Sequence, residues 1–167
     1  MTGLSVCKTL EELLPDREIR LKWPNDVHLS GRKVCGVLIE SGPQKSDLLV
    51  LGIGVNVNNS FAAAPEEIRS LGTSVYDETG KPTDLTDLLI RLLRQLEAHL
   101  TRLSAGDTRL VAAWKSRCAL SGRIVEVDVG TRKSTGFCRE IDEDGALVLL
   151  TEGGPVRLHG GVVTQIW

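Results

Sequence analysis

The hydrophobic pattern of this 167-residue chain changes near Cys118, and that change constrains the fold more than any other feature. Before Cys118, segments with helical spacing occur together with segments that have the two-residue period of strands. After it, short alternating strands follow one another without a helix. We therefore predict an α+β chain with two domains, at residues 1–118 and 119–167.

Helical spacing is clearest in two segments of the first domain. Leu4 to Leu14 has apolar residues at helical spacing, and Pro15 follows where a helix must stop. Thr83 or Asp84 caps a longer helix, whose leucine stripe runs to Leu103. The stripe covers too few heptads for a coiled coil, so we expect a buried wall of the core. A further helix opens at Gly106-Asp107, and Asn59 to Asp84 is a polar connection.

Strand signals begin at Ile19 and predict an antiparallel meander. Its strands are Arg20 to Trp23, Lys33 to Glu40 and Asp47 to Val57, with a turn at Ser30-Gly31 and a loop at Ser41 to Ser46.

The last of these strands has one apolar face and one nearly bare face. Leu51, Ile53, Val55 and Val57 fall on the first, which we expect to be core, and Gly52, Gly54, Asn56 and Asn58 fall on the second. Paired glycines in a strand mark a close approach of a ligand or another backbone. A helix packed on the sheet explains them equally well.

Five short strands after Cys118 predict a small barrel. They are Ile124 to Val129, Ser134 to Ile141, Ala146 to Leu150, Val156 to Leu158 and Val162 to Ile166.

Composition excludes several classes of partner. The net charge is −2 and no part of the chain has a concentrated basic face, so nucleic acid is not expected. No segment approaches the roughly 18 apolar residues of a membrane span, and we expect a cytoplasmic protein. The four widely spaced cysteines predict buried, reduced thiols, and the three distant histidines predict exposed side chains without a metal site.

Generic nucleotide-binding motifs are absent. Gly52-Ile53-Gly54 lacks the third glycine of a dinucleotide fingerprint, and no phosphate-cradling P-loop occurs. Three ordered blocks remain: Lys22-Trp23-Pro24-Asn25-Asp26, then Gly31-Arg32-Lys33 with Gly36-Val37-Leu38-Ile39-Glu40, then Gly52 to Asn58.

These blocks closely resemble the central part of biotin protein ligases, which adenylate biotin and transfer it to a lysine of a biotin carboxyl-carrier domain. The resemblance implies a mixed sheet with helices on one side, like that of class II aminoacyl-tRNA synthetases and only partial here. It also implies an SH3-like barrel at Arg123 to Trp167 that assists ATP and carrier engagement.

The same resemblance assigns roles to residues. Lys33 corresponds to the lysine that contacts the biotin carboxyl group and the adenylate phosphate. Independently of the resemblance, the residue types suggest that Lys22 would add positive charge and that Asp26 would hold Mg²⁺, orient Lys33 or accept a proton. Biotin, ATP and the biotinyl-AMP intermediate would contact a set of residues that comprises Asn25, Asp26, Lys33, Gly36, Gly54, Val55 and Asn56. Trp23 and Pro24 are expected to fix the loop.

Without the resemblance, Lys22 and Lys33 have an ordinary explanation as lysines that block unwanted pairing at a strand edge. With it, two further hypotheses stay open. The chain is a non-catalytic binding or regulatory module derived from a ligase, or it is a lipoate-attachment relative, although the Lys22 to Asp26 block favours biotin.

The chain also departs from the family pattern. Nothing in Met1 to Arg20 matches the glycine-arginine-rich loop that wraps biotin in family members. We expect weaker ligand binding, an unpaired sheet edge and exposed apolar surface. The chain is therefore expected to self-associate as a homodimer through the exposed sheet edge, or to need a partner that bears the missing half.

Overall fold

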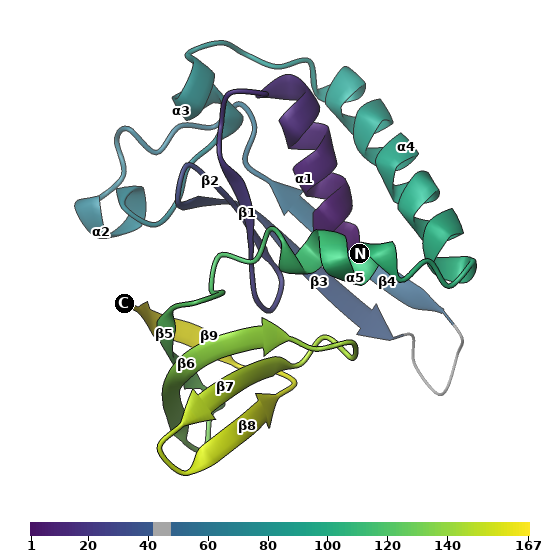
Figure 1. The fold of residues 1–167 in the computed structure, drawn as a ribbon. Coiled ribbons are helices and arrows are strands. Elements are labelled where there is room, and N and C mark those ends of the chain that lie inside the picture. Colours follow the sequence, from purple (N-terminus) through teal and green to yellow (C-terminus); the bar gives the residue numbers. More distant parts are fainter. Residues whose placement is uncertain (42–47) are drawn as a thin grey trace. The chain divides into compact units, whose positions relative to one another are not determined.

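The computed structural model describes residues 1–41 and 48–167. The chain divides into two compact units. The first contains Met1–Leu21 and Asn25–Asp107, and the second contains Lys22–Pro24 and Thr108–Trp167. Figure 1 shows the elements of both. The domain boundary at 118/119 stays a prediction, and the loop expected at Ser41 to Ser46 lies outside the described residues from position 42 onward.

The first unit is built on a four-stranded sheet with the order β1-β2-β3-β4 (Figure 1). Its strands are β1 (Ile19–Lys22), β2 (Asp26–Leu29), β3 (Arg32–Ser41) and β4 (Leu49–Val55). β2 pairs antiparallel with β3, and β3 pairs antiparallel with β4. The sheet is therefore antiparallel rather than mixed, and its one described parallel contact is the isolated bridge between Lys33 and Gly72.

Helix α1 (Thr2–Leu13) ends just before Pro15, as predicted, because proline cannot continue the helical hydrogen bonding. Its buried face includes Leu4, Val6, Cys7 and Leu10. α1 packs against β2 and β3, whose buried side chains Val27 and Val34 complete this core.

Helix α4 (Leu85–Ser104) starts at the predicted cap, where the Asp84 carboxylate accepts hydrogen bonds from the backbone N–H groups of Thr86 at 2.8 Å and Asp87 at 3.1 Å. The prediction that α4 is a buried wall was wrong. α4 packs on α1 along one face only, so Leu88 and Leu92 are buried while other stripe residues, namely Leu85, Leu89, Leu93, Leu100 and Leu103, are exposed.

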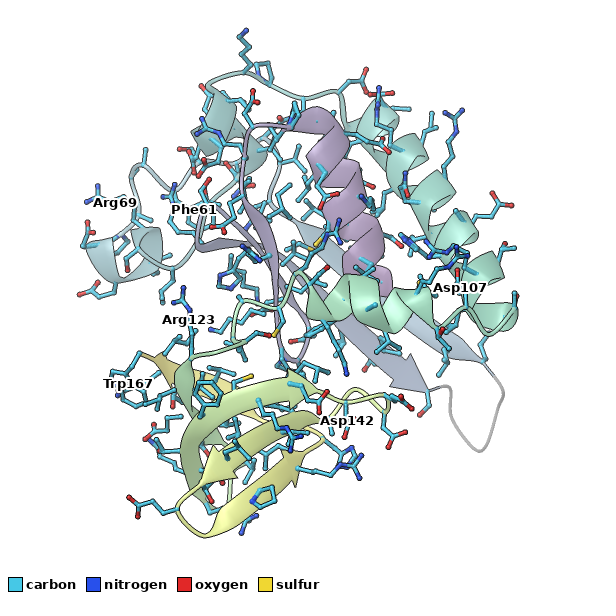
Figure 2. All side chains as sticks on the ribbon, in the orientation of Figure 1. Phe61, Arg69, Asp107, Arg123, Asp142 and Trp167 are labelled. Atoms are coloured by element: carbon cyan, nitrogen blue, oxygen red, sulfur yellow. The ribbon has the colours of Figure 1, made fainter. Side chains whose placement is uncertain are left out.

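The second unit holds α5 (Arg109–Lys115) and a five-stranded antiparallel sheet with the order β8-β7-β6-β5-β9. The strands are β5 (Ile124–Asp128), β6 (Lys133–Ile141), β7 (Leu147–Thr151), β8 (Gly154–Leu158) and β9 (Val162–Ile166), close to the predicted bounds. Figure 2 marks Asp142, at the β6–β7 turn, where it pairs with Arg157.

Trp23 belongs to the core of this second unit. Its side chain is buried, and its indole N–H donates a hydrogen bond to the carbonyl oxygen of Gly145 at 3.0 Å. Because a buried indole needs a hydrogen-bond partner, this contact satisfies the one polar atom of the ring. Trp23 therefore fixes the loop that follows β1, as the sequence suggested.

The polar connection predicted between Asn59 and Asp84 contains two short helices, α2 (Glu66–Arg69) and α3 (Val75–Thr79). Ser74 caps α3 through its hydroxyl oxygen, which accepts from the N–H of Asp77, and Gly80 ends the helix with a φ of 68°. The serine cap and the glycine stop were signals that the sequence pattern contained.

The prediction for the cysteines was confirmed, and the prediction for the histidines was wrong at one position. All four cysteines are buried, as expected. His99 is buried rather than exposed, and its Nδ1 lies 2.9 Å from the hydroxyl oxygen of Ser5. In the described part of the chain, no helix is both long and apolar enough to cross a membrane.

Candidate functional site

The side chains of Lys33 and Asp26 meet on the sheet of the first unit. The Lys33 Nζ lies 2.6 Å from an Asp26 carboxylate oxygen, with Lys33 on β3 and Asp26 at the start of β2. The Lys33 side chain is 47% exposed, and ion pairs this open contribute only about 0–1 kcal/mol to stability. The pair therefore does more to place the ammonium group than to hold the fold.

Gly36 provides the space that this ammonium occupies. It pairs directly with Asp26 in the β2–β3 register. A Cβ atom on Gly36 would lie 3.3 Å from both the Cε and Nζ atoms of Lys33, so a larger residue would displace the lysine. The structure therefore brings these three predicted site residues together.

Asn25 lies in the loop between β1 and β2 and connects this loop to β3. Its side-chain amide donates to the carbonyl oxygen of Val37 at 2.7 Å, and its own carbonyl accepts from the N–H of Val37 at 2.9 Å. This places Asn25 beside Asp26 and commits part of its amide group to strand β3.

A cavity of about 270 Å³ adjoins Lys33. Lys33 and Asn56 supply its polar lining, and Phe61, Ile68, Leu71 and Gly72 supply the apolar walls. Asn56 directly follows β4 and is held by its backbone N–H, which donates to the carbonyl oxygen of Val34 at 2.8 Å. A charged amine at the edge of an apolar cavity suits a ligand with a flat apolar part and an anionic part.

The glycines of β4 leave open backbone on that strand. A Cβ on Gly54 would meet nothing nearer than the Gly36 carbonyl oxygen at 4.0 Å, and one on Gly52 would meet Leu38 at 3.7 Å. Within the described residues, neither glycine is needed for helix packing, which removes that explanation. Val55 pairs with Cys35 at the end of the same strand.

The predicted apolar face of β4 is only partly core. Leu51 is 37% exposed and Ile53 is half-buried, while Val57, beyond the strand, is buried. β4 lies at one end of the sheet order, so it has a described strand on one side only.

Cys35 lies in the same strand as Lys33 and is buried. Burial raises the pKa of its thiol to about 12, and the negative charge of Asp26 adds to this effect while Lys33 opposes it. Cys35 therefore stays a neutral thiol at physiological pH.

Lys22 falls in the second unit, with Trp23 and Pro24, and so is grouped apart from Lys33 and Asp26. The described residues also contain no group of three or more His, Cys, Asp or Glu side chains able to hold a metal ion.

Four cavity residues were not predicted as part of the site: Phe61, Ile68, Leu71 and Gly72. Phe61 lies on the segment between β4 and α2 (Figure 2). Its ring packs so closely on Gly72 that a Cβ there would lie 2.6 Å from the ring. Gly72 in turn pairs with Lys33 through the isolated bridge, a contact that no local pattern reveals.

Two family models match the chain. Residues 2–58 match the Biotin/lipoate A/B protein ligase family, and residues 120–164 match the Biotin protein ligase C terminal domain. The first match contains Lys22, Asp26, Lys33, Gly36 and Asn56.

Among curated relatives, the chain is similar to the biotin--[acetyl-CoA-carboxylase] ligase of Mycobacterium tuberculosis, with 34% identity over 98% of this chain and 60% of the relative. The chain thus spans about 60% of the length of that relative.

Among solved structures, the chain is similar to the biotin protein ligase of Aquifex aeolicus. Its apo structure has a TM-score of 0.85 and 33% identity, over 99% of this chain and 72% of that one. Its complex with biotin and ATP has a TM-score of 0.84 and 33% identity, over 99% of this chain and 68% of that one. With this fold, this sequence similarity and both family models, the chain belongs to the biotin protein ligase family.

Proposed function

We propose that this chain takes part in the ATP-dependent attachment of biotin to a lysine of a biotin carboxyl-carrier domain. The observation that carries the proposal is the position of Lys33, which lines the cavity and also pairs with Asp26. The solved relative from Aquifex aeolicus holds biotin and ATP, which supports the same two ligands here. ATP dependence also agrees with the expected cytoplasmic location.

In the first step, a biotin carboxylate oxygen attacks the α-phosphorus of ATP, which forms biotinyl-AMP and releases pyrophosphate. Both the carboxylate and the phosphate carry negative charge, so an ammonium between them lowers the barrier. Lys33 supplies that charge. Lys22 falls in the other compact unit, and its contribution of positive charge stays a prediction. The apolar walls formed by Phe61, Ile68 and Leu71 suit the flat adenine base.

In the second step, the amine of the carrier lysine attacks the biotinyl carbonyl carbon, an amide bond forms and AMP leaves. The amine loses a proton, and Asp26 is the carboxylate placed to accept it or to hold Lys33 in position. Asn25, Gly36, Gly54, Val55 and Asn56 would contact the adenylate through amide groups and open backbone.

Mg²⁺ fits this site only as an ion brought in with ATP. Asp26 is one carboxylate already paired with Lys33, and the described residues contain no larger cluster of metal-ligating side chains. Because Mg²⁺ commonly binds one carboxylate together with substrate phosphates, Asp26 would be its protein ligand and the ion would offset phosphate charge.

The five-stranded sheet of the second unit corresponds to the SH3-like barrel of the family, within a domain at residues 119–167. The match of residues 120–164 to the C-terminal domain model supports this assignment. In this role it would assist the binding of ATP and of the carrier domain.

The first experiment measures pyrophosphate release and carrier biotinylation by the purified chain with ATP, biotin and a carrier domain. We expect Lys33→Ala to lower the rate about 100-fold, the usual cost of losing one group that stabilises transition-state charge. Lys8→Ala is the matched control, because Lys8 is also ion-paired and 46% exposed. Equal rates for the two variants would contradict the assignment of Lys33.

Two outcomes separate the alternatives. A chain that binds a non-hydrolysable biotinyl-AMP analogue, with binding weakened by Lys33→Ala, but transfers no biotin is a non-catalytic module. Preference for lipoate over biotin in direct competition identifies a lipoate-attachment relative, as the first family model spans both activities by name.

A further inference from the structure

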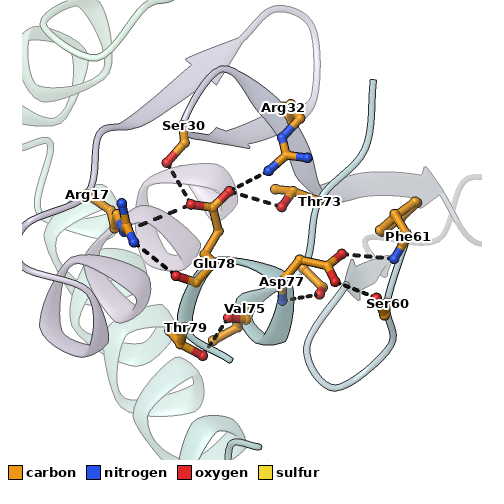
Figure 3. Close-up of polar contacts among 11 residues, drawn as sticks. Arg17, Ser30, Arg32, Ser60, Phe61, Thr73, Val75, Asp77, Glu78 and Thr79 are labelled. Carbon is orange, nitrogen blue, oxygen red and sulfur yellow. Dashed lines mark hydrogen bonds and ion pairs between the residues drawn. The ribbon is translucent and has the colours of Figure 1, made fainter. Parts of the chain in front are cut away.

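Helix α3 carries two consecutive carboxylates, Asp77 and Glu78, that reach different segments of the first unit (Figure 3). Neither residue contacts the cavity directly. Asp77 accepts a hydrogen bond from Phe61, which lines the cavity, and Glu78 accepts one from Arg32, which is next to the lining residue Lys33. Because these carboxylates already accept hydrogen bonds from the protein, they hold the loops in position rather than bind a ligand.

Asp77 holds the segment that contains Phe61. One carboxylate oxygen accepts from the Ser60 hydroxyl at 2.6 Å, and the other accepts from the backbone N–H of Phe61 at 2.9 Å. The Ser60 oxygen accepts in turn from the N–H of Ala62 at 3.1 Å. These bonds fix the backbone at the point where the Phe61 ring packs on Gly72.

The charge state of Asp77 supports this role. Burial alone would raise its pKa, but the hydrogen bonds from Ser60, Phe61 and Ser74 outweigh burial and hold the pKa below its usual value. Asp77 is therefore ionised at neutral pH, and an ionised carboxylate accepts stronger hydrogen bonds than a neutral group.

Glu78 ties together the segments on either side of Lys33. Its carboxylate accepts from the Ser30 hydroxyl at 3.0 Å, from the Arg32 guanidinium at 2.8 Å and from the Thr73 hydroxyl at 3.1 Å. Arg17 adds a second cation, at 3.9 Å. The Glu78 side chain is only 7% exposed, so these partners replace the water it has lost.

Lys33 lies between two of the residues that Glu78 holds. Arg32 precedes it directly, and the N–H of Thr73 donates to the Lys33 carbonyl oxygen at 2.9 Å. The Lys33 N–H donates to the carbonyl oxygen of Leu71 at 2.8 Å. Glu78 therefore fixes the backbone of Lys33 from both sides.

We propose that Asp77 and Glu78 are positioning residues of the Lys33 cavity: Asp77 sets the wall formed by Phe61, and Glu78 sets the backbone from which Lys33 reaches the ligand. The proposal rests on the function proposed above and names two residues that act through others. The two residues should have separate effects, because Asp77 positions a wall of the cavity and Glu78 positions the charged amine of Lys33.

The test compares Asp77→Asn and Glu78→Gln in the full chain, with Glu97→Gln, an exposed carboxylate on α4, as the control. Asp77→Asn removes one acceptor, and we expect the KM for ATP to rise about tenfold with kcat changed less. Glu78→Gln removes the charge that anchors Arg32, and we expect kcat to fall about tenfold with KM changed less. If the two carboxylates only stabilised the fold, neither the KM for ATP nor kcat would change at a temperature where all variants are folded.

Amide hydrogen exchange and binding of ATP alone give readouts that do not depend on catalysis. We expect faster exchange at Phe61 and Ala62 in Asp77→Asn, and at Lys33 and Thr73 in Glu78→Gln. If the wild-type chain forms no adenylate, the proposed function fails while the exchange and binding measurements still test the positioning. If both variants kept the amide exchange rates and the ATP affinity of the wild type, the positioning proposal would be wrong.

Discussion

At the residue scale, the absence of a side chain at Gly36 decides where the Lys33 amine can lie. A methyl group there would contact the Cε and Nζ atoms of Lys33 at 3.3 Å. At Gly72, the missing side chain lets the Phe61 ring close one wall of the cavity. Glycine acts at both positions by the space it leaves and not by an unusual backbone angle.

His99 gives a residue-scale prediction of pH dependence. Burial lowers the pKa of its imidazole, and the positive charges of Arg102 and Lys8 add to this effect. The unfolded chain then binds a proton at a higher pH than the folded chain does. The contribution of His99 to stability is complete above its ordinary pKa of about 6.5, and it is lost as the pH falls from there to the lower pKa of the folded chain.

We expect the melting temperature of the wild-type chain to fall between pH 8 and pH 5.5 by more than that of His99→Gln. Thermal denaturation at both pH values measures the difference, and His159→Gln, at an exposed position, serves as the control. Parallel pH profiles for the wild type and His99→Gln would show that burial of this imidazole is not linked to stability.

At the element scale, the strands of the second unit were placed closely because turns with glycine separate short alternating segments. The helices of the first unit were predicted less completely. The leucine stripe placed α4 correctly, but the number of leucines said nothing about which neighbours cover them. Helices α2 and α3 were missed because four or five residues give no period to detect.

The loop after β1 gives the element-scale prediction. Trp23 fills the core of the second unit, so Trp23→Ala is expected to lower its free energy of unfolding by about 3–5 kcal/mol. Trp167→Ala is the matched control because Trp167 is exposed, and about 0.5 kcal/mol is expected there. Urea denaturation followed by circular dichroism compares the two. Similar losses would mean that Trp23 is not an anchor of that core.

At the scale of the whole molecule, the first unit exposes several apolar side chains on β3 and β4. Leu38, Ile39, Leu49 and Val50 are each more than half exposed, and β4 ends the described sheet. Both features were expected from the sequence. An edge strand with apolar side chains favours pairing with another chain.

We therefore expect the chain to self-associate through this edge, as a homodimer. Analytical ultracentrifugation should show dimers that increase with concentration, and Leu49→Lys should weaken the association at least about tenfold, because a buried lysine needs a partner. Leu103→Lys, at a similarly exposed leucine on α4, should not. A clean monomer at high concentration would contradict the prediction.

The sequence by itself determined the α+β class, most strands and the grouping of Lys33, Asp26 and Gly36, because period and motif spacing are local properties. Tertiary structure alone decided the rest. Gly72 pairs with Lys33, and Glu78 binds Arg32 across 46 residues of chain, while Phe61 joins the surroundings of Lys33 through its packing on Gly72. No local pattern records these contacts. Burial of His99 and exposure of the α4 leucines were likewise set by which surfaces meet, because hydrophobic burial depends on the neighbour as well as on the residue.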